Sequence, residues 1–171
     1  MAILPMVYIP NDVLKTKAEE VKTVNDEIRT MLDNMVDTMY HYNGIGLAAN
    51  QVGILHRITV IDVADENENS NLIKMVNPII TYKSDKMNTY SEGCLSIPTG
   101  EGKIERPEEI EVEYLDENGG KKNIRTGGLL ATCIQHEIDH LDGILFIDYL
   151  SKIKRDMVKR KVEKHLKAGG V

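Results

Sequence analysis

The apolar positions between residues 25 and 42 follow a helical period. They form one stripe, which predicts an amphipathic helix: Ile28, Met31, Leu32, Met35, Met39 and Tyr42. Thr23 followed by Asp26 resembles a capping box at the start of this helix, and Asn43-Gly44 marks its end. We expect the methionines of this stripe to fill a hydrophobic core.

The middle of the chain carries patterns that are typical of strands. Residues 56–63 (HRITVIDV) are rich in β-branched side chains, and residues 72–82 contain a second candidate, in which Pro78 indicates an edge position or a bulge. Residues 109–115 alternate strictly between polar and apolar side chains. The sequence DENGG then leads into residues 121–126, which predicts a hairpin.

Two further helices are predicted over residues 127–143 and 151–167. The first has so little polar surface that we expect it to be central and buried. The strands precede these helices without a regular strand–helix alternation, and the chain shows no internal repeat or linker. These features favour an α+β fold. We expect a single domain over residues 1–171, because this length lies within the usual ~100–200 residues of one domain.

Composition narrows the class of protein further. Hydrophobic residues make up 42% and charged residues 28%, which excludes a collagen-like or wholly disordered chain. Cys94 and Cys133 are too few for a disulfide scaffold. The first ten residues lack the basic start of a secretory signal, and no apolar run approaches the ~20 residues of a membrane helix. We therefore expect a soluble, cytoplasmic protein with no membrane partner.

The charge is unevenly distributed along the chain. The net charge is −6, which argues against general affinity for nucleic acid, yet residues 151–168 hold eight Lys or Arg and two acidic residues. That segment therefore has a net charge of +6, and the rest of the chain has −12. The basic segment is either a solvated helix end or a docking surface for a phosphate-rich partner.

The strongest chemical signal is the sequence H-E-x-x-H at residues 136–140, within the first of the two late helices. His140 lies about 40° around the helix from His136 and ~6 Å along its axis, so both imidazoles can reach one metal ion. Glu137 flanks them and could take a proton from water on that ion. The alternative is a chance pair of histidines. Because the chain has only five histidines, we favour the metal site.

A two-histidine site needs a third protein ligand, and the residues themselves leave the choice open. Phe146 occupies the position of the third histidine in the metzincin pattern, and Glu163 is a weak candidate on the basic segment. Cys133 shares the helix face of the histidines, together with Leu129, and can chelate as C-x-x-H. Cys94 lies in the sequence SEGCLS, in which a glycine permits close approach of the backbone.

Three motifs, in this order, resemble the signatures of the bacterial-type peptide deformylases: residues 44–51 (GIGLAANQ), 92–96 (EGCLS) and 135–140 (QHEIDH). The similarity extends from about Leu4 to the C-terminal helix. It implies a metal-dependent hydrolase that removes the formyl group from the N-terminal formyl-methionine of newly synthesised polypeptides and releases formate. It also implies antiparallel sheets packed around the helix that carries H-E-x-x-H, with a helix at the C-terminus.

The resemblance assigns Cys94, His136 and His140 as ligands of one divalent metal ion, whose fourth position holds water. The ion is expected to be Fe²⁺, with Zn²⁺ or Ni²⁺ as substitutes, although the residue types alone would suit Zn²⁺ equally well. Cys133 then becomes part of the wall of the substrate pocket, beside Leu129.

The resemblance also implies a mechanism. Water on the metal attacks the formyl carbonyl while Glu137 acts as general base and then as general acid toward the departing amine. The Gln51 amide and the Leu95 backbone N–H donate to the developing oxyanion. The residues expected to contact the peptide or its methionine side chain are Gly44, Ile45, Gly46, Leu129 and Cys133. Glu92 is expected to orient a ligand histidine.

The resemblance implies nascent N-formyl-methionyl peptides as partners, and the ribosome as the docking site of the basic helix at residues 151–168. We expect no sequence-specific binding of nucleic acid. Two alternatives are a different metal amidase or peptidase with the same motif, and a noncatalytic zinc-stabilised protein docked on the ribosome. Phe146 argues against the first. Glu137 and Gln51 argue against the second, because a closed structural zinc site needs a fourth ligand and no base.

Overall fold

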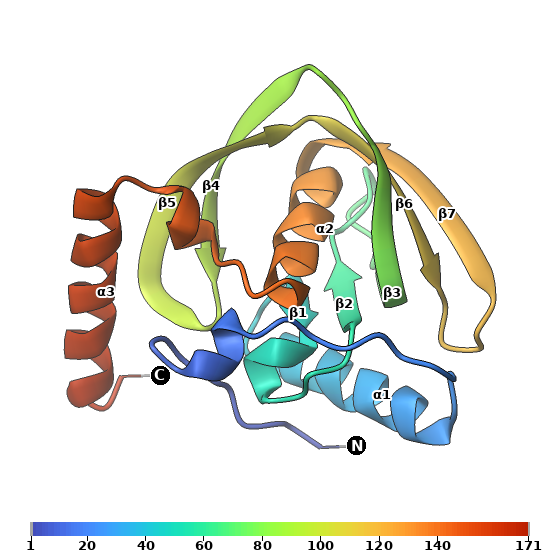
Figure 1. Ribbon diagram of the computed structural model, residues 1–171, viewed down its shortest axis with the longest axis horizontal. Helices are drawn as coiled ribbons and strands as arrows, with labels where there is room; N and C mark the ends of the chain where they lie inside the picture. The colour runs from blue at the N-terminus through green and yellow to red at the C-terminus, as the bar shows by residue number, and fades with distance from the viewer. Residues whose placement is uncertain (1, 171) are drawn as a thin grey trace.

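The computed structural model describes residues 2–170 (Figure 1). Its helices are α1 (Asp26–His41), α2 (Gly128–Leu141) and α3 (Lys152–Lys167), with three 3₁₀ helices, η1 (Asp12–Lys15), η2 (Ala49–Val52) and η3 (Phe146–Tyr149). Its strands are β1 (Gly46–Ala48), β2 (Ile58–Asp62), β3 (Leu72–Lys83), β4 (Met87–Cys94), β5 (Ile97–Pro107), β6 (Glu109–Leu115) and β7 (Lys121–Gly127).

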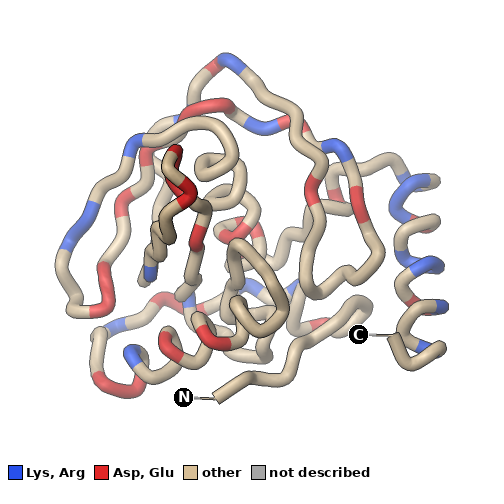
Figure 2. Tube along the Cα trace, turned by 180° about the vertical axis from the view of Figure 1, so that it is seen from behind, with Lys and Arg blue, Asp and Glu red and all other residues tan. Residues whose placement is uncertain are grey.

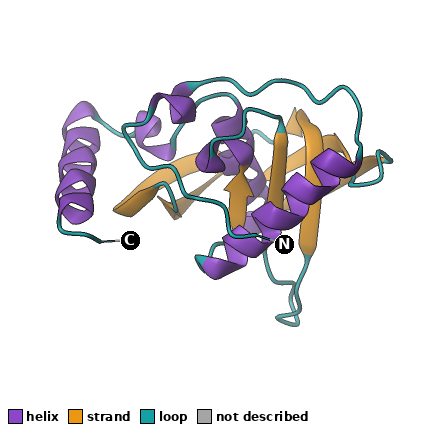
Figure 3. Cartoon of the chain, turned by 90° about the horizontal axis from the view of Figure 1, so that it is seen from below, coloured by secondary structure: helices purple, strands orange, loops and turns teal. Residues whose placement is uncertain are grey.

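The strands form two antiparallel sheets. The larger sheet has the order β1-β2-β3-β6-β7, and β4 pairs with β5 in a separate hairpin. Helix α2 lies inside the curve of the sheets and packs against strands of both (Figure 1). Helix α1 crosses the larger sheet, and α3 stands at the other side of the molecule against β5 (Figure 3). This arrangement confirms the expected α+β fold around a central helix.

Burial of α2 agrees with its apolar sequence. Residues 131–138 are all buried. Ile134 and Ile138 pack with buried side chains of the larger sheet, including Ile61 and Val112. Each such side chain contributes roughly 1.5–3 kcal/mol through the surface that it removes from water. Because this face is held by the sheet, the opposite face, with both histidines of the motif, is directed toward β4 and η2.

The structure tests two local expectations, the capping box at Thr23 and the position of Pro78. The capping box at Thr23 is wrong: α1 begins at Asp26, and the side chain of Asn25 accepts a hydrogen bond from the Ile28 N–H at 3.0 Å. Thr23 therefore lies outside the first turn. Pro78 lies beyond Val76, the last residue of β3 that pairs with β2, so at this position β3 borders only β6 among the described strands. Pro78 also lies where the register with β6 shifts, so the bulge is confirmed.

The β4–β5 hairpin has no counterpart in the sequence-based strand predictions. Its register shifts between Glu92 and Cys94, so that residues 98–101 of β5 bulge out of the pairing. Gly100 in this bulge lies against Ile97 and against Val158 of α3, with no room for a side chain. The hairpin thus carries Cys94 at its inner end and supports α3 on its outer side.

Lys and Arg side chains gather along α3 (Figure 2). Val162 is the one residue of this helix that is fully buried, while Ile153 and Met157 are exposed among the basic residues. Within residues 2–170, no helix combines the length and the apolar character that crossing a membrane requires.

Candidate active site

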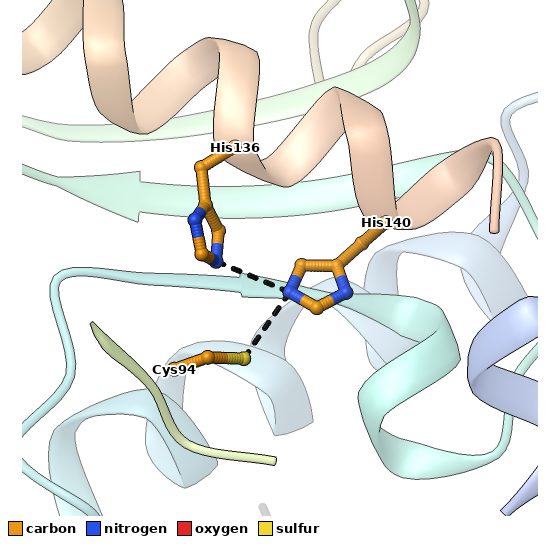
Figure 4. Close-up of side chains that lie close together, drawn as sticks. All are labelled: Cys94, His136 and His140. Carbon is orange, nitrogen blue, oxygen red and sulfur yellow. Dashed lines mark hydrogen bonds between the residues drawn. The ribbon is translucent and has the colours of Figure 1, made fainter. Parts of the chain in front are cut away.

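Three potential metal ligands from two distant segments converge at the centre of the fold (Figure 4). His136 and His140 project from successive turns of α2, and Cys94 ends β4. The Cys94 Sγ lies 3.3 Å from His140 Nε2, and the two Nε2 atoms are 3.2 Å apart. All three donor atoms lie within 4.8 Å of one another. The residues left open whether Cys94 or Cys133 supplies the third ligand atom, and Cys94 is the cysteine whose sulfur lies beside the two histidines.

This donor set fits a divalent cation. Two ring nitrogens that face each other at 3.2 Å can share only one hydrogen, whereas a cation between them and the thiolate satisfies all three donors. Burial, and then the neighbouring His136, lowers the pKa of His140 well below its usual value. The ring of His140 is therefore held neutral, as a metal ligand must be. Burial lowers the pKa of His136, but its contacts with Cys94 and Glu92 outweigh this and raise that pKa, so a cation that binds here must displace a proton from His136.

A buried ion-pair network holds His136 from behind. Its Nδ1 lies 2.8 Å from Glu92 Oε1, as expected for an orienting carboxylate. Arg106, only 5% exposed, donates to both oxygens of Glu92 at 2.7 and 3.0 Å and to Asp139 Oδ2 at 2.8 Å. The Tyr149 hydroxyl donates to the same Asp139 oxygen at 2.7 Å. Burial raises the pKa of Glu92, but the bonds from His136 and Arg106 outweigh it, so the carboxyl stays ionised.

Sequence reasoning missed Arg106, Asp139 and Tyr149. Asp139 lies within the H-E-x-x-H motif, but the motif itself indicates no role for it. Arg106 and Tyr149 lie in segments that contain no recognisable motif. The strand pairing of β4 with β5 brings Arg106 beside Glu92, and α2 supplies Asp139. No spacing rule for a single element could have found this network.

Glu137 lies beside the ligands in an apolar environment. It is 3% exposed, and its Oε1 has no hydrogen-bond partner among residues 2–170. Burial raises the pKa of this carboxyl to about 7. Gly46 explains how the carboxylate fits here, since a side chain at that position would overlap Glu137 Oε2 and lie 3.0 Å from Cys133 Sγ. A carboxyl that titrates near neutral pH is suited to proton transfer.

Gln51 and Leu95 both lie beside Cys94. Gln51 Oε1 accepts a hydrogen bond from the Ala48 N–H at 2.9 Å, which fixes the orientation of the amide. Its Nε2 then donates to Cys94 Sγ and to Ser96 Oγ, both at 3.3 Å. Leu95 follows Cys94 directly, and Gly44 leaves room for its side chain, since a Cβ there would lie 2.8 Å from Leu95 Cδ1.

A cavity of about 380 Å³ opens over these groups. Ile45 and Leu129 are half-exposed at its rim, while Cys133 and Thr132 are buried in its wall. The Cys133 thiol points to the Ile45 carbonyl oxygen at 3.7 Å. Every predicted site residue except His140 lines the cavity. The lining also includes Tyr90, together with Asn43 and Ser91, to which sequence reasoning assigned no role.

An H-E-x-x-H helix whose two histidines meet a cysteine, beside a buried carboxylate at the base of an open cavity, defines the class of the protein: a metal-dependent hydrolase. The profile of the polypeptide deformylase family matches residues 3–156, and the chain belongs to this family, whose members remove N-formyl groups.

Comparisons over nearly the whole chain agree. The chain is 46% identical to the peptide deformylase of Rhizobium meliloti (strain 1021), over 99% of this chain and 98% of that protein. It is similar to the crystal structure of peptide deformylase from Ehrlichia chaffeensis with a TM-score of 0.95 and 41% identity, covering 98% and 99% of the two chains.

A third similar structure was solved with a peptide. It is the Met-Ala-Ser-bound class I type b peptide deformylase from Acinetobacter baumannii, with a TM-score of 0.81 and 34% identity, covering 87% of this chain and 99% of that one.

Proposed function

We propose that this protein hydrolyses the formyl group of N-terminal formyl-methionine in newly synthesised polypeptides and releases formate. The observation that carries the proposal is the convergence of Cys94 Sγ with the Nε2 atoms of His136 and His140 under an open cavity, beside the buried Glu137. An open cavity and a free carboxylate are features of a catalytic metal site rather than of a closed structural one.

Cys94, His136 and His140 would hold one divalent ion, which we infer to be Fe²⁺, with Zn²⁺ or Ni²⁺ as substitutes. Such an ion acts as a Lewis acid and lowers the pKa of water. Arg106 neutralises Glu92, and Glu92 accepts the Nδ1 hydrogen of His136. With its Nδ1 hydrogen held by Glu92, His136 would offer its Nε2 lone pair to such an ion.

Glu137 moves the proton. Its unpartnered Oε1 takes a proton from the attacking water and passes it to the nitrogen of the departing amine. The Gln51 Nε2 and the Leu95 backbone N–H donate to the formyl oxygen as negative charge develops on it. Loss of one such donor typically costs ~10²–10³ in rate.

The cavity selects the peptide. We propose that the unbranched methionine side chain packs among Ile45, Leu129 and Cys133, with the peptide backbone beside the segment from Gly44 to Gly46. The Met-Ala-Ser complex of the Acinetobacter baumannii relative supports a pocket for a peptide that begins with methionine.

Formate release tests this function. We expect metal-loaded protein to release one formate per molecule of formyl-Met-Ala-Ser and to leave the Met-Ala and Ala-Ser bonds intact. Unformylated Met-Ala-Ser is the matched control. Cleavage of that control would favour a peptidase, and absence of formate from the loaded protein would contradict the proposal.

The rate should depend on pH through Glu137. A general base works only when ionised, so kcat/KM should fall as the pH drops through its pKa. Burial is the largest cause that raises this pKa to about 7, and a metal ion nearby would further favour the ionised form, so the midpoint should lie at or below 7. Profiles measured at constant metal content should show one acid limb in the wild type and none in Glu137→Gln.

We infer that residues 1–171 act as one catalytic domain in the cytoplasm, where nascent chains emerge. The packing of α2 against both sheets supports one domain, because each sheet covers part of the same helix. The basic surface of α3 supports docking on the ribosome, since lysines attract phosphate-rich surfaces.

Replacing Lys159, Arg160 and Lys161 by Glu should weaken co-sedimentation with ribosomes, most at low salt, and spare activity on short formyl peptides. The change turns three positive charges into negative ones and so lowers the net charge by six, on a helix none of whose residues lines the cavity. The triple replacement of Lys22, Lys83 and Lys121 by Glu, all exposed elsewhere, is the control. Undiminished co-sedimentation of the α3 variant would contradict docking through this helix.

A further inference from the structure

Besides Glu137 Oε1, two buried side-chain atoms near the candidate metal site lack a hydrogen-bond partner within residues 2–170: Nδ1 of His140 and Oδ1 of Asn50. His140 is 1% exposed, and Asn50 is 0% exposed. The two atoms are complementary. When His140 Nε2 binds a cation, the hydrogen of the neutral ring must be on Nδ1, which is then a donor, whereas an amide oxygen can only accept.

The two buried side chains belong to elements that pack against each other. Asn50 is in η2, which packs against α2. In Figure 4 the outer ring nitrogen of His140 is directed away from Cys94 and His136, toward the side on which η2 follows β1. Burial leaves both atoms out of reach of bulk solvent.

The segment from Thr16 to Ala18 ties the two residues together. Asn50 Nδ2 donates to the Thr16 carbonyl oxygen at 2.8 Å, and the Ala18 N–H donates to the carbonyl oxygen of Leu141, the neighbour of His140, at 2.8 Å. Thr16 has an extended backbone, and two extended residues span only ~7 Å. Ala18 and Leu141 also share a buried cluster with Ala48.

We propose that Asn50 is a positioning residue for the metal ligand His140, whose Nδ1 hydrogen it accepts at Oδ1 through one buried water. Buried polar groups are nearly always paired, and a buried water needs at least two polar partners. The link fixes the tautomer of His140 with the Nε2 lone pair toward the ion, as Glu92 does for His136. This inference rests on the proposed metal role of His140.

Two variants separate this role from a purely structural one. Asn50→Leu removes both the oxygen and the bond to Thr16. Asn50→Asp removes the donor to Thr16 but keeps an acceptor for His140. If Asn50 served only to hold Thr16, both variants would affect metal binding equally.

We expect Asn50→Leu to weaken Zn²⁺ binding by ~10–100-fold in chelator competition, the usual effect of losing a group that orients a ligand. Asn50→Asp should stay close to wild type or bind more tightly. Equal weakening in both variants, or none in either, would overturn the inference. Wild-type protein that binds no stoichiometric Zn²⁺ would instead contradict the metal centre itself, and the inference with it.

A spectroscopic readout covers the case in which Asn50→Asp fails to fold. In Zn²⁺-loaded wild type labelled with ¹⁵N-histidine, His140 should carry its hydrogen on Nδ1 and exchange it slowly with water. In Asn50→Leu the exchange should be faster. A hydrogen that is absent from Nδ1 in the wild type, or an exchange rate that Asn50→Leu leaves unchanged, contradicts the proposal.

Discussion

Replacing Glu137 by Gln should lower kcat/KM for formyl-methionyl peptides by ~10²–10⁴-fold, the usual contribution of a general base, without loss of the metal. Glutamine fills the same space beside Gly46 but cannot accept and return a proton. The bonds that support His136 come from Glu92 and not from Glu137, so metal content should match the wild type.

The control for this prediction is Glu101→Gln. Glu101 is an exposed carboxylate that accepts a hydrogen bond from Ser91, which lines the cavity, and within residues 2–170 it belongs to no group of potential metal ligands. Measurement of kcat, KM and bound metal for both variants checks the role of Glu137. A Glu137→Gln enzyme that retained a tenth or more of wild-type activity would show that another group moves the proton.

Replacing Cys94 by Ala should remove both the metal and the activity. The remaining imidazoles of His136 and His140 offer two ligands where a tightly bound ion needs at least three. Metal affinity should fall by more than the ~10–100-fold expected when a group that only orients a metal ligand is lost. Metal analysis after dialysis, together with formate release, measures both effects.

Cys133→Ala is the matched control, because it removes the second thiol of the same cavity. Cys133 Sγ contacts the Ile45 carbonyl oxygen and belongs to no group of potential metal ligands within residues 2–170. This variant should keep its metal and change only how the methionine side chain packs. Loss of metal from Cys133→Ala, or retention of metal by Cys94→Ala, would reverse the assignment of the thiolate.

The predictable parts of the fold are those whose signal is local. The stripe that includes Leu32 and Met35 predicted α1, and the strict alternation of residues 109–115 predicted β6, because each element shows one face to the core. The start of α1 was placed on the wrong cap because Thr23 and Asn25 both precede it, and the choice between them depends on the backbone.

The β4–β5 hairpin could not be predicted in this way. Strand β5 contains two prolines, Gly100 and Gly102, and several charged residues, and its bulge interrupts the alternation. Among residues 2–170, strands β4 and β5 pair with no strand besides each other, so no larger sheet imposes a buried face on them.

The site residues also divide into those that a local sequence pattern predicts and those that it does not. Spacing alone identified His136, Glu137 and His140, since one helix places all three. The third ligand stayed open between Cys94 and Cys133 until the family resemblance assigned Cys94, and the hairpin indeed places Cys94 beside the histidines. Arg106 could not be predicted because its partners, Glu92 and Asp139, lie 14 and 33 residues away in the chain.

The most direct test of the account is an anomalous diffraction map at the absorption edge of the metal, recorded on Fe²⁺- or Zn²⁺-loaded crystals. We predict one strong peak per chain, ~2.3 Å from Cys94 Sγ and ~2.0–2.1 Å from the Nε2 atoms of His136 and His140 if the ion is zinc. A peak bound elsewhere, or a fully loaded crystal in which the sulfur of Cys94 lies outside bonding distance of the ion, would contradict it.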